Sequence, residues 1–383
     1  MKKIESLLQE LCPEGVPNLE LGEVAEIVKG MQVNKDVMSD TYRYPVYNGG
    51  IFSSGRHTEF NFPAETITVS QGGASAGFVN FVREPLWVGA HCYAVSPSKK
   101  VLNRWLFYVL KNAQDKLQDM KVGAGIPALD RKTLSELHIP VPPIRIQEEI
   151  VSILDKFTEL EAELEAELEA RRTQLEYVRK AYLSFGEEVS WSTLGEVADY
   201  TNGKAHEKLV SPEGQIPLVT ARFISRNGEA NRYISLEDVR TNAAAGDIAL
   251  VLSDLPNGRA LARTFFIDRD NAYAINQRVA RLRVRNLKHV DQRFMYHYLD
   301  RNPGLMRYDN GVDQTHLSKQ QVTSLSFPVP HLSVQREIAR VLDTMNSLVN
   351  DMSIGLPAEI QARRKQYEYY RNKLLTFKEL DAA

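Results

Sequence analysis

The chain has 383 residues, of which 43% are hydrophobic and 25% charged, and its formal net charge is −2. This composition excludes disordered and fibrous proteins, and the length predicts two or three domains rather than one core. No apolar run approaches the roughly 20 residues that cross a bilayer, and the first residues form an amphipathic pattern rather than an apolar signal core, so we expect a cytoplasmic protein. The two cysteines, Cys12 and Cys92, are too few for a disulfide framework.

The same landmarks occur twice, in the same order. Leu-Gly-Glu-Val-Ala begins at Leu21 and again at Leu194, and Pro-Val-Pro begins at Pro140 and again at Pro328. Ala-Arg-Arg-x-Gln-x-Glu-Tyr begins at Ala170 and returns near the end of the chain. The duplication predicts two similar halves with pseudo-two-fold symmetry, which suits a symmetric target such as DNA.

Each half begins with a mixed α/β segment. In the first, residues 66–70 and 92–95 alternate like strands, and residues 103–118 have the apolar spacing of a helix. In the second, residues 247–252 and 279–284 resemble strands, and residues 293–300 resemble a helix. Glycine pairs at residues 49–50 and 72–73 predict loops between these elements.

A proline-rich extended exit and a long helix follow each segment. The first helix is expected over residues 147–185 and contains the quartet Glu-Ala-Glu-Leu twice, at residues 161–168. Its leucines make a narrow apolar seam on a helix surface that is otherwise acidic, so the helix needs a partner to bury the seam. The natural partner is its own copy over residues 335–377, which Gly355-Leu356-Pro357 should interrupt.

Charge is distributed unevenly along the chain. Residues 141–185 hold 6 basic and 10 acidic side chains, whereas residues 17–140 hold 13 and 12, and residues 191–330 hold 18 and 15. The acidity is therefore concentrated in the helix, and the α/β segments are mildly basic. Any affinity for DNA would depend on local patches or on a more basic partner.

In the order and spacing of these parts, the chain resembles the specificity subunits of type I restriction–modification enzymes. The resemblance is carried by Leu21-Gly-Glu-Val-Ala25, Gly125-Ile126-Pro127-x-Leu129, Ile139-Pro-Val-Pro-Pro143, the Glu-Ala-Glu-Leu quartets and Ala362-Arg-Arg-Lys-Gln-Tyr-Glu-Tyr-Tyr-Arg371, and it covers nearly the whole chain. The quartets are similar to those of a type IC-like subgroup in which their number sets the spacing between recognised half-sites.

The resemblance implies an α+β fold. Two similar α/β target-recognition domains would be separated by two long antiparallel coiled-coil helices in a circular, pseudo-two-fold arrangement. The boundaries we expect are an N-terminal helix at 1–16 that docks on the C-terminal helix, recognition domains at 17–143 and 187–331, a central spacer helix at 144–186 and a C-terminal spacer helix at 332–383.

The resemblance also implies a function without catalysis in this chain. Each recognition domain would read one half of a bipartite double-stranded DNA site, and the helix pair would set the half-site spacing and dock two methyltransferase subunits. Those subunits would bind S-adenosylmethionine and methylate adenine N6, and restriction subunits would add ATP- and Mg-dependent translocation and cleavage for host defence. We expect no cofactor in this chain.

Candidate DNA-contacting residues are polar or basic residues of loops that follow or precede expected strands. Arginine and glutamine suit base edges, and lysine suits phosphates, although each of these loops is nearly as well explained as an ordinary turn. The candidates are Lys29, Gln32, Lys35, Gln71, Ser75, Lys204, Lys208, Arg222, Ser253, Asn257, Arg259, Gln277 and Arg278.

The expected helix-pair and partner interface consists of apolar and aromatic residues on the two long helices, with one arginine. They are Leu154, Leu160, Leu164, Leu168, Tyr177, Leu342, Tyr367, Tyr370 and Arg371. The eight histidines are scattered without the spacing of metal ligands, so no metal site is expected.

Two other functions stay open from the residues alone. The chain fits a symmetric coiled-coil scaffold that binds protein partners without DNA. It could also be a methyltransferase itself, although the loop Ser253-Asp254-Leu255-Pro256 lacks the second proline and the stacking aromatic of an Asp-Pro-Pro-Tyr motif.

Overall fold

A computed structural model describes residues 2–122, 127–241, 243–255, 260–351 and 354–380. The fold is α+β, as expected, and the chain divides into two compact units. The first unit contains the residues up to Leu164 together with those from Ile360 onward, and the second contains Glu165–Glu359. The boundary therefore lies inside the long helix α6 and near the start of the last helix.

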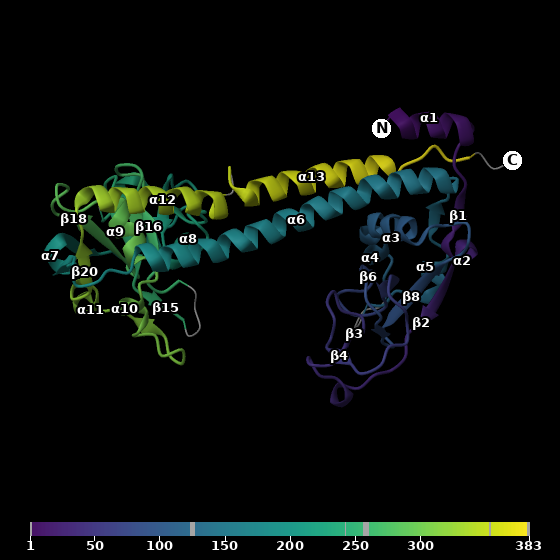
Figure 1. Cartoon of the computed structure of the whole chain (residues 1–383), viewed down its shortest axis with the longest axis horizontal. Helices are drawn as coiled ribbons and strands as arrows, with labels where there is room; N and C mark the ends of the chain where they lie inside the picture. Colours follow the sequence, from purple (N-terminus) through teal and green to yellow (C-terminus); the bar gives the residue numbers. More distant parts are fainter. Residues whose placement is uncertain (1, 123–126, 242, 256–259, 352–353, 381–383) are drawn as a thin grey trace. The chain divides into compact units, whose positions relative to one another are not determined.

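The first unit contains an antiparallel four-stranded sheet in the order β2-β8-β5-β6 (Figure 1). A three-stranded sheet has the order β4-β3-β7, with β3 and β7 parallel, and a third sheet pairs β1 with β9. The strands are β1 (Asn18–Glu20), β2 (Ala25–Lys29), β3 (Tyr44–Tyr47), β4 (Arg56–His57), β5 (Thr66–Ser70), β6 (Val79–Val82), β7 (Trp87–Val88), β8 (Cys92–Pro97) and β9 (His138–Pro140). The helices before the long one are α1 (Lys2–Leu11), α2 (Leu21–Val24), η1 (Lys35–Val37), α3 (Asn103–Asn112), α4 (Gln114–Asp119) and α5 (Arg131–Ser135).

The second unit repeats this topology. Its four-stranded sheet has the order β11-β18-β14-β16, its three-stranded sheet the order β13-β12-β17, and β10 pairs with β20. The strands are β10 (Ser190–Thr193), β11 (Ala198–Asn202), β12 (Ile216–Val219), β13 (Tyr233–Ile234), β14 (Ile248–Val251), β15 (Ser253–Asp254), β16 (Thr264–Phe266), β17 (Ala274–Ile275), β18 (Val279–Val284), β19 (Thr315–His316) and β20 (Ser326–Val329). The helices are α7 (Leu194–Val197), η2 (Glu207–Leu209), α8 (Ala221–Ser225), η3 (Leu236–Asp238), α9 (Gln292–Leu299), α10 (Pro303–Met306) and α11 (Lys319–Thr323).

The repeated Leu-Gly-Glu-Val segment forms the same short helix in both units, because a capping box starts it each time. Glu23 accepts a hydrogen bond from the backbone N–H of Glu20, and Glu196 accepts one from that of Thr193. The N–H of Thr193 and the hydroxyls of Ser192 and Thr193 lower the pKa of Glu196 to about 2. Leu21 and Leu194 at the helix starts are fully buried, which explains why this motif is present twice.

The expected strands are confirmed within a residue or two, but one expected helix is wrong. Residues 103–118 do not form one helix, because the chain bends at Ala113 and continues as α4. The long helices begin and end about three residues before the expected positions. They are α6 (Ile144–Tyr182), α12 (Leu332–Asn350) and α13 (Leu356–Leu374). The second long helix is interrupted as expected: Gly355 lies in the break, and Leu356 and Pro357 begin α13.

The seam of α6 extends beyond the quartet leucines. Among its buried and half-buried positions from residue 157 onward, 157, 161, 164, 168, 171, 175 and 178 alternate in steps of four and three. On α13, positions 360, 363, 367, 370 and 374 show the same alternation. A mean step of 3.5 is the coiled-coil period, so this line, which includes Leu164 and Leu168, follows heptad spacing and not strict steps of four.

Within the first unit, α13 lies against α6 (Figure 1). Phe157 of α6 contacts the rings of Tyr367 and Tyr370, with centroids 6.3 and 5.6 Å away, and Arg364 forms an ion pair with Glu161. The core of this unit also includes Ile4 and Leu7 of α1, Leu374 at the end of α13, and Leu375 directly after it.

None of the helices in the described ranges has the length and apolarity that a membrane-spanning segment needs.

Candidate nucleic-acid interface

One end of each four-stranded sheet gathers most of the candidate residues. In the first unit, β2 and β5 both run antiparallel to β8, so their carboxyl ends lie beside the start of β8. Lys29 is the last residue of β2, Gln71 follows β5, and His91 precedes β8. The backbone N–H of Gln71 donates to the carbonyl of His91 over 2.8 Å, which fixes these two residues side by side.

The second unit has the same geometry with other side chains. The N–H of Leu252, after β14, donates to the carbonyl of Arg278, before β18, over 2.9 Å. Arg278 therefore occupies the place of His91. Likewise Lys204 forms a parallel bridge with Asn276, as Met31 does with Gly89. The fold is shared, whereas the side chains at this end of the sheet differ.

At this end of the second unit, a hollow of about 460 Å³ is lined only by polar side chains: Ser253, Gln277, Arg278, Gln314 and His316. The strands β15 and β19 bring two of them together, with Ser253 opposite His316. Gln277 and Arg278 are exposed, and they are the residue types that read adenine and guanine edges.

Hydrogen bonds hold several of these groups in place. Glu207 accepts from the amides of Asn276 at 2.9 Å and of Gln277 at 3.1 Å, and these bonds, the Asn276 one foremost, lower the pKa of the Glu207 carboxyl. Ser253 is 3% exposed, and its hydroxyl accepts from the Gln314 amide at 3.0 Å. Ser253 therefore positions Gln314 rather than presenting its own hydroxyl to solvent.

The remaining candidates lie around these two sheet ends. Gln32 and Lys35 are exposed in the chain after β2, and Lys208 is exposed in η2 next to Glu207. Ser75 is half-buried in the turn before β6, whose Gly77 has a positive φ and no room for a Cβ beside the backbone of Leu117.

Arg222 is exposed on α8, outside the lining of the polar hollow. Asn257 and Arg259 lie outside the described residues, as do Gly125 and Ile126 of the Gly125-Ile126-Pro127-x-Leu129 stretch. His91, Glu207, Gln314 and His316 were missed, because only the pairing of distant strands brings them to this end.

The expected interface residues of the long helices fall into three groups. Leu154 and Leu342 are fully buried, and Leu154 belongs to the globular core of the first unit rather than to the helix seam. Leu164 and Leu168 lie on the seam, and Leu160 is half-buried beside it. Tyr177, in contrast, is 74% exposed.

In each unit, an aspartate of one long helix binds side chains of the helix that follows the four-stranded sheet. In the first unit Asp155 accepts from Arg104 and Tyr108, and burial together with the Asp155 contact raises the pKa of Tyr108. In the second unit Asp343 accepts from His297 at 2.8 Å. Arg293, which corresponds to Arg104, lies 3.6 Å from the same carboxylate.

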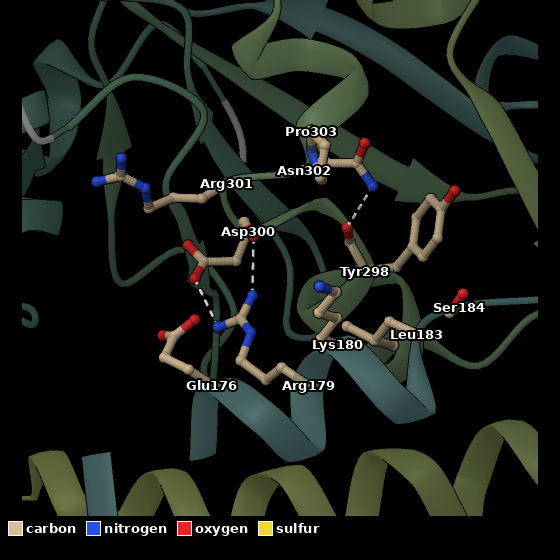
Figure 2. Close-up of a pocket in the computed structure, with 10 residues that line it drawn as sticks. All are labelled: Glu176, Arg179, Lys180, Leu183, Ser184, Tyr298, Asp300, Arg301, Asn302 and Pro303. Atoms are coloured by element: carbon tan, nitrogen blue, oxygen red, sulfur yellow. Dashed lines mark hydrogen bonds and ion pairs between the residues drawn. The ribbon is translucent and has the colours of Figure 1, made fainter. Parts of the chain in front are cut away.

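An arginine near the end of the other long helix also binds each unit. Arg371 of α13 donates to Asn112 at the end of α3, over 3.0 Å. Arg179 of α6 donates to the carboxylate of Asp300 at 2.9 Å and to its carbonyl at 2.8 Å, at the end of α9 (Figure 2). This ion pair lies in a pocket of about 670 Å³ in the second unit, which Lys180, Arg301 and Tyr298 also line.

Comparison with known proteins agrees with this architecture. The family model of the type I restriction modification DNA specificity domain matches residues 13–170 and again 186–362. The chain is 28% identical to the Escherichia coli type I restriction enzyme EcoR124I/EcoR124II specificity subunit, over 98% of this chain and 97% of that one.

Two solved structures share the fold. The type I restriction–modification S subunit from M. genitalium has a TM-score of 0.62 at 18% identity, and 96% of each chain is covered. A chain from a structural study of complex assembly in the type I R-M system has a TM-score of 0.57 at 16% identity, with 95% of this chain and 98% of that chain covered. Because the family model matches both halves of the sequence, the chain belongs to the type I restriction–modification DNA specificity family.

Proposed function

We propose that the two units each read one half of a bipartite double-stranded DNA site. The observation that carries this proposal is the duplicated sheet end: one backbone geometry presents unlike side chains in the two units, Met31 and His91 in one, Lys204 and Arg278 in the other. Two similar frameworks with different base-contacting groups suit two different short sequences. Exposed lysines beside them, such as Lys35 and Lys208, suit the phosphates.

As a specificity subunit, the chain is non-catalytic. Under the proposal, S-adenosylmethionine, ATP and Mg belong to partner subunits that methylate, translocate and cleave, and no cofactor belongs to this chain. Under the same proposal, the protein acts in the cytoplasm, where the chromosomal DNA lies.

We propose the exposed faces of α6 and α13 as docking sites for two modification subunits. Arg172, Gln174, Glu176 and Tyr177 recur as Arg364, Gln366, Glu368 and Tyr369, and all eight are exposed. Burial explains repeated residues such as Gln147 and Gln335, but it does not explain these, although one of the eight, Arg364, forms an ion pair with Glu161 of the other long helix. One surface present twice suits two copies of one partner, and tyrosine and arginine are enriched in such contacts.

Sequencing of methylated bases in cells with and without this gene tests the proposed function. We expect one bipartite motif with adenine methylation that disappears when the gene is deleted. Unchanged methylation, together with binding of protein partners but no salt-dependent preference for any duplex, would favour the DNA-free scaffold instead.

Labelled methyl transfer by the purified chain alone tests the third possibility. We expect none, because the proposal assigns the methyl donor to the modification subunits.

A further inference from the structure

An apolar pair in the first unit is exposed where its counterpart in the second unit is buried. After β3 the chain turns at Gly49-Gly50 and presents Ile51 and Phe52, which are 43% and 82% exposed. After the matching strand β12, the chain forms α8, whose Phe223 and Ile224 are 1% and 2% exposed. Phe223 packs against Phe265 in the core, with ring centroids 4.9 Å apart. Packing inside the first unit therefore does not explain why an apolar residue stands at position 52.

Hydrogen bonds fix the Phe52 loop at the end of the four-stranded sheet where Gln71 and His91 lie side by side. Asn80 donates to the carbonyl of Ile51 at 3.3 Å, and the hydroxyl of Ser70, the residue before Gln71, donates to the carbonyl of Gly50 at 3.4 Å. Gly49 has a φ of +90°, and a Cβ there would lie 2.8 Å from the carbonyl oxygen of His91. The loop thus lies against His91 and against Ser70, the neighbour of Gln71, at the candidate interface.

The surroundings indicate what covers this apolar pair. Met31, 59% exposed, leaves the same sheet end, and the exposed cations Lys29 and Lys35 stand on either side of it in the sequence. An exposed cation such as Lys29, at the sheet end against which the Phe52 loop lies, suits a polyanion that itself presents an apolar group. In the major groove of DNA that group is the 5-methyl of thymine, which phenylalanine is known to contact.

We infer that Phe52, supported by Ile51, contacts a thymine 5-methyl group in the half-site that the first unit reads. This inference rests on the proposed function and names part of its substrate. It makes the two units chemically unlike: the first reads a thymine by apolar contact, and the second reads base edges by hydrogen bonds from Gln277 and Arg278.

The test uses the chain assembled with its modification subunits and a duplex that carries the motif found by methylation sequencing. Each thymine of the half-site assigned to the first unit is replaced in turn by deoxyuridine, which removes only the methyl group. We expect one replacement to weaken binding by the wild-type complex about three- to five-fold, the effect of one buried methyl. F52A should bind the thymine and deoxyuridine duplexes equally, and F52L should keep part of the preference.

Circular dichroism and a thermal melt should match the wild type for F52A, because the side chain is mostly solvated. L287A is the matched control, since Leu287 is 56% exposed but follows the far end of β18. It should keep the full preference for thymine.

Two kinds of failure are distinguishable. If the wild-type complex discriminates its motif but F52A keeps the thymine preference, or if the half-site has no thymine on either strand, the inference is wrong and the proposed function survives. The inference is also wrong if F52A weakens both duplexes equally and abolishes unstacking of a 2-aminopurine probe, since Phe52 would then be a wedge between base pairs. A wild-type complex that binds its motif no better than a scrambled duplex overturns both.

Discussion

Each unit buries one glutamine at the start of a long helix. Gln147 donates to the carbonyls of Lys100 and Pro142, and its own carbonyl accepts from the N–H of Leu102. Gln335 makes the same three bonds in the second unit, to His289, Pro330 and Asp291. This one side chain joins the proline-rich stretch before the long helix to the residues at the start of α3 or α9. That role explains why the glutamine recurs in the sequence.

Replacing Gln335 by alanine should destabilise the second unit by roughly 2–4 kcal/mol, because three part-buried backbone groups lose their hydrogen-bond partner together and a fully buried side chain is truncated. Denaturant unfolding followed by circular dichroism measures the loss. Gln361 is an exposed glutamine on α13, and alanine there should leave stability unchanged. Equal stability of both variants would show that these bonds contribute nothing.

Arg278 and Lys208 should have different effects on DNA binding. Under the proposed function Arg278 reads a base edge, so R278A should relax specificity at one position at a cost of about 1–3 kcal/mol, with other positions unaffected. Lys208 would contact a phosphate, so K208A should weaken all duplexes alike, lowering the slope of log affinity against log salt by about 1. Binding titrations of single-base variants of the motif at several salt concentrations separate the two.

K288A is the control for both substitutions, because Lys288 is exposed beyond the far end of β18. Its binding should equal that of the wild type. Loss of specificity in K208A, or none in R278A, would contradict the assigned roles.

At the scale of the element, the seam of α6 decides how the quartets act. Leu164, Leu168, Arg171 and Leu175 follow the 3.5-residue period, whereas Glu163, Glu165 and Glu167 are exposed. Removal of four residues brings Arg171 three positions after Leu164, so the seam stays continuous although the helix is locally overwound. The helix can therefore change length without losing its apolar contact line.

Deleting Glu165–Leu168 should change the gap between the half-sites by one or two base pairs and leave both half-sites unchanged. The deletion shortens the helix by about 6 Å and rotates the remainder of the helix by about 40°, because each residue adds about 1.5 Å and 100°. Methylation sequencing of cells that carry the deletion gives the gap directly. The double variant E165Q/E167Q keeps the length and should keep the gap. Altered half-sites in the deletion would refute the role of the helix as a spacer.

At the scale of the whole molecule, the repeated exposed tyrosines should govern partner number. Y369A alone should reduce the assembly from two modification subunits to one, and Y177A/Y369A should reduce it to none, because truncation of an interface tyrosine commonly costs about 2 kcal/mol or more. Light scattering after size-exclusion chromatography counts the subunits. Y233A, at an exposed tyrosine of β13, should leave two bound. Two subunits on the double variant would place docking elsewhere.

The order of elements could be predicted from the sequence because the same motifs occur in the same order in both halves, so each half supports the elements expected in the other. The strands β5 and β18 and the long helices were visible in their spacing. The bend at Ala113 was not, because residues 103–118 keep an apolar face through it and the break depends on what α4 packs against. The 3.5-residue period of the seam could not be recognised from the sequence, because the seam includes a charged residue. Glu161 lies on it and forms the ion pair with Arg364, whereas Leu160 is half-buried beside it.

By itself, the sequence determined that this protein is built twice from one plan, with acidic long helices and two α/β units. Local patterns such as the capping boxes at Glu20 and Thr193 and the proline exits act over a few residues, so they can be read directly. Only the tertiary structure decided which loops share a surface, because strands that pair antiparallel across the sheet bring His316 beside Ser253, and Arg278 beside Leu252. It also decided that Phe52 is exposed while Phe223 is buried, since that depends on whether the chain after the strand forms a helix that covers the core.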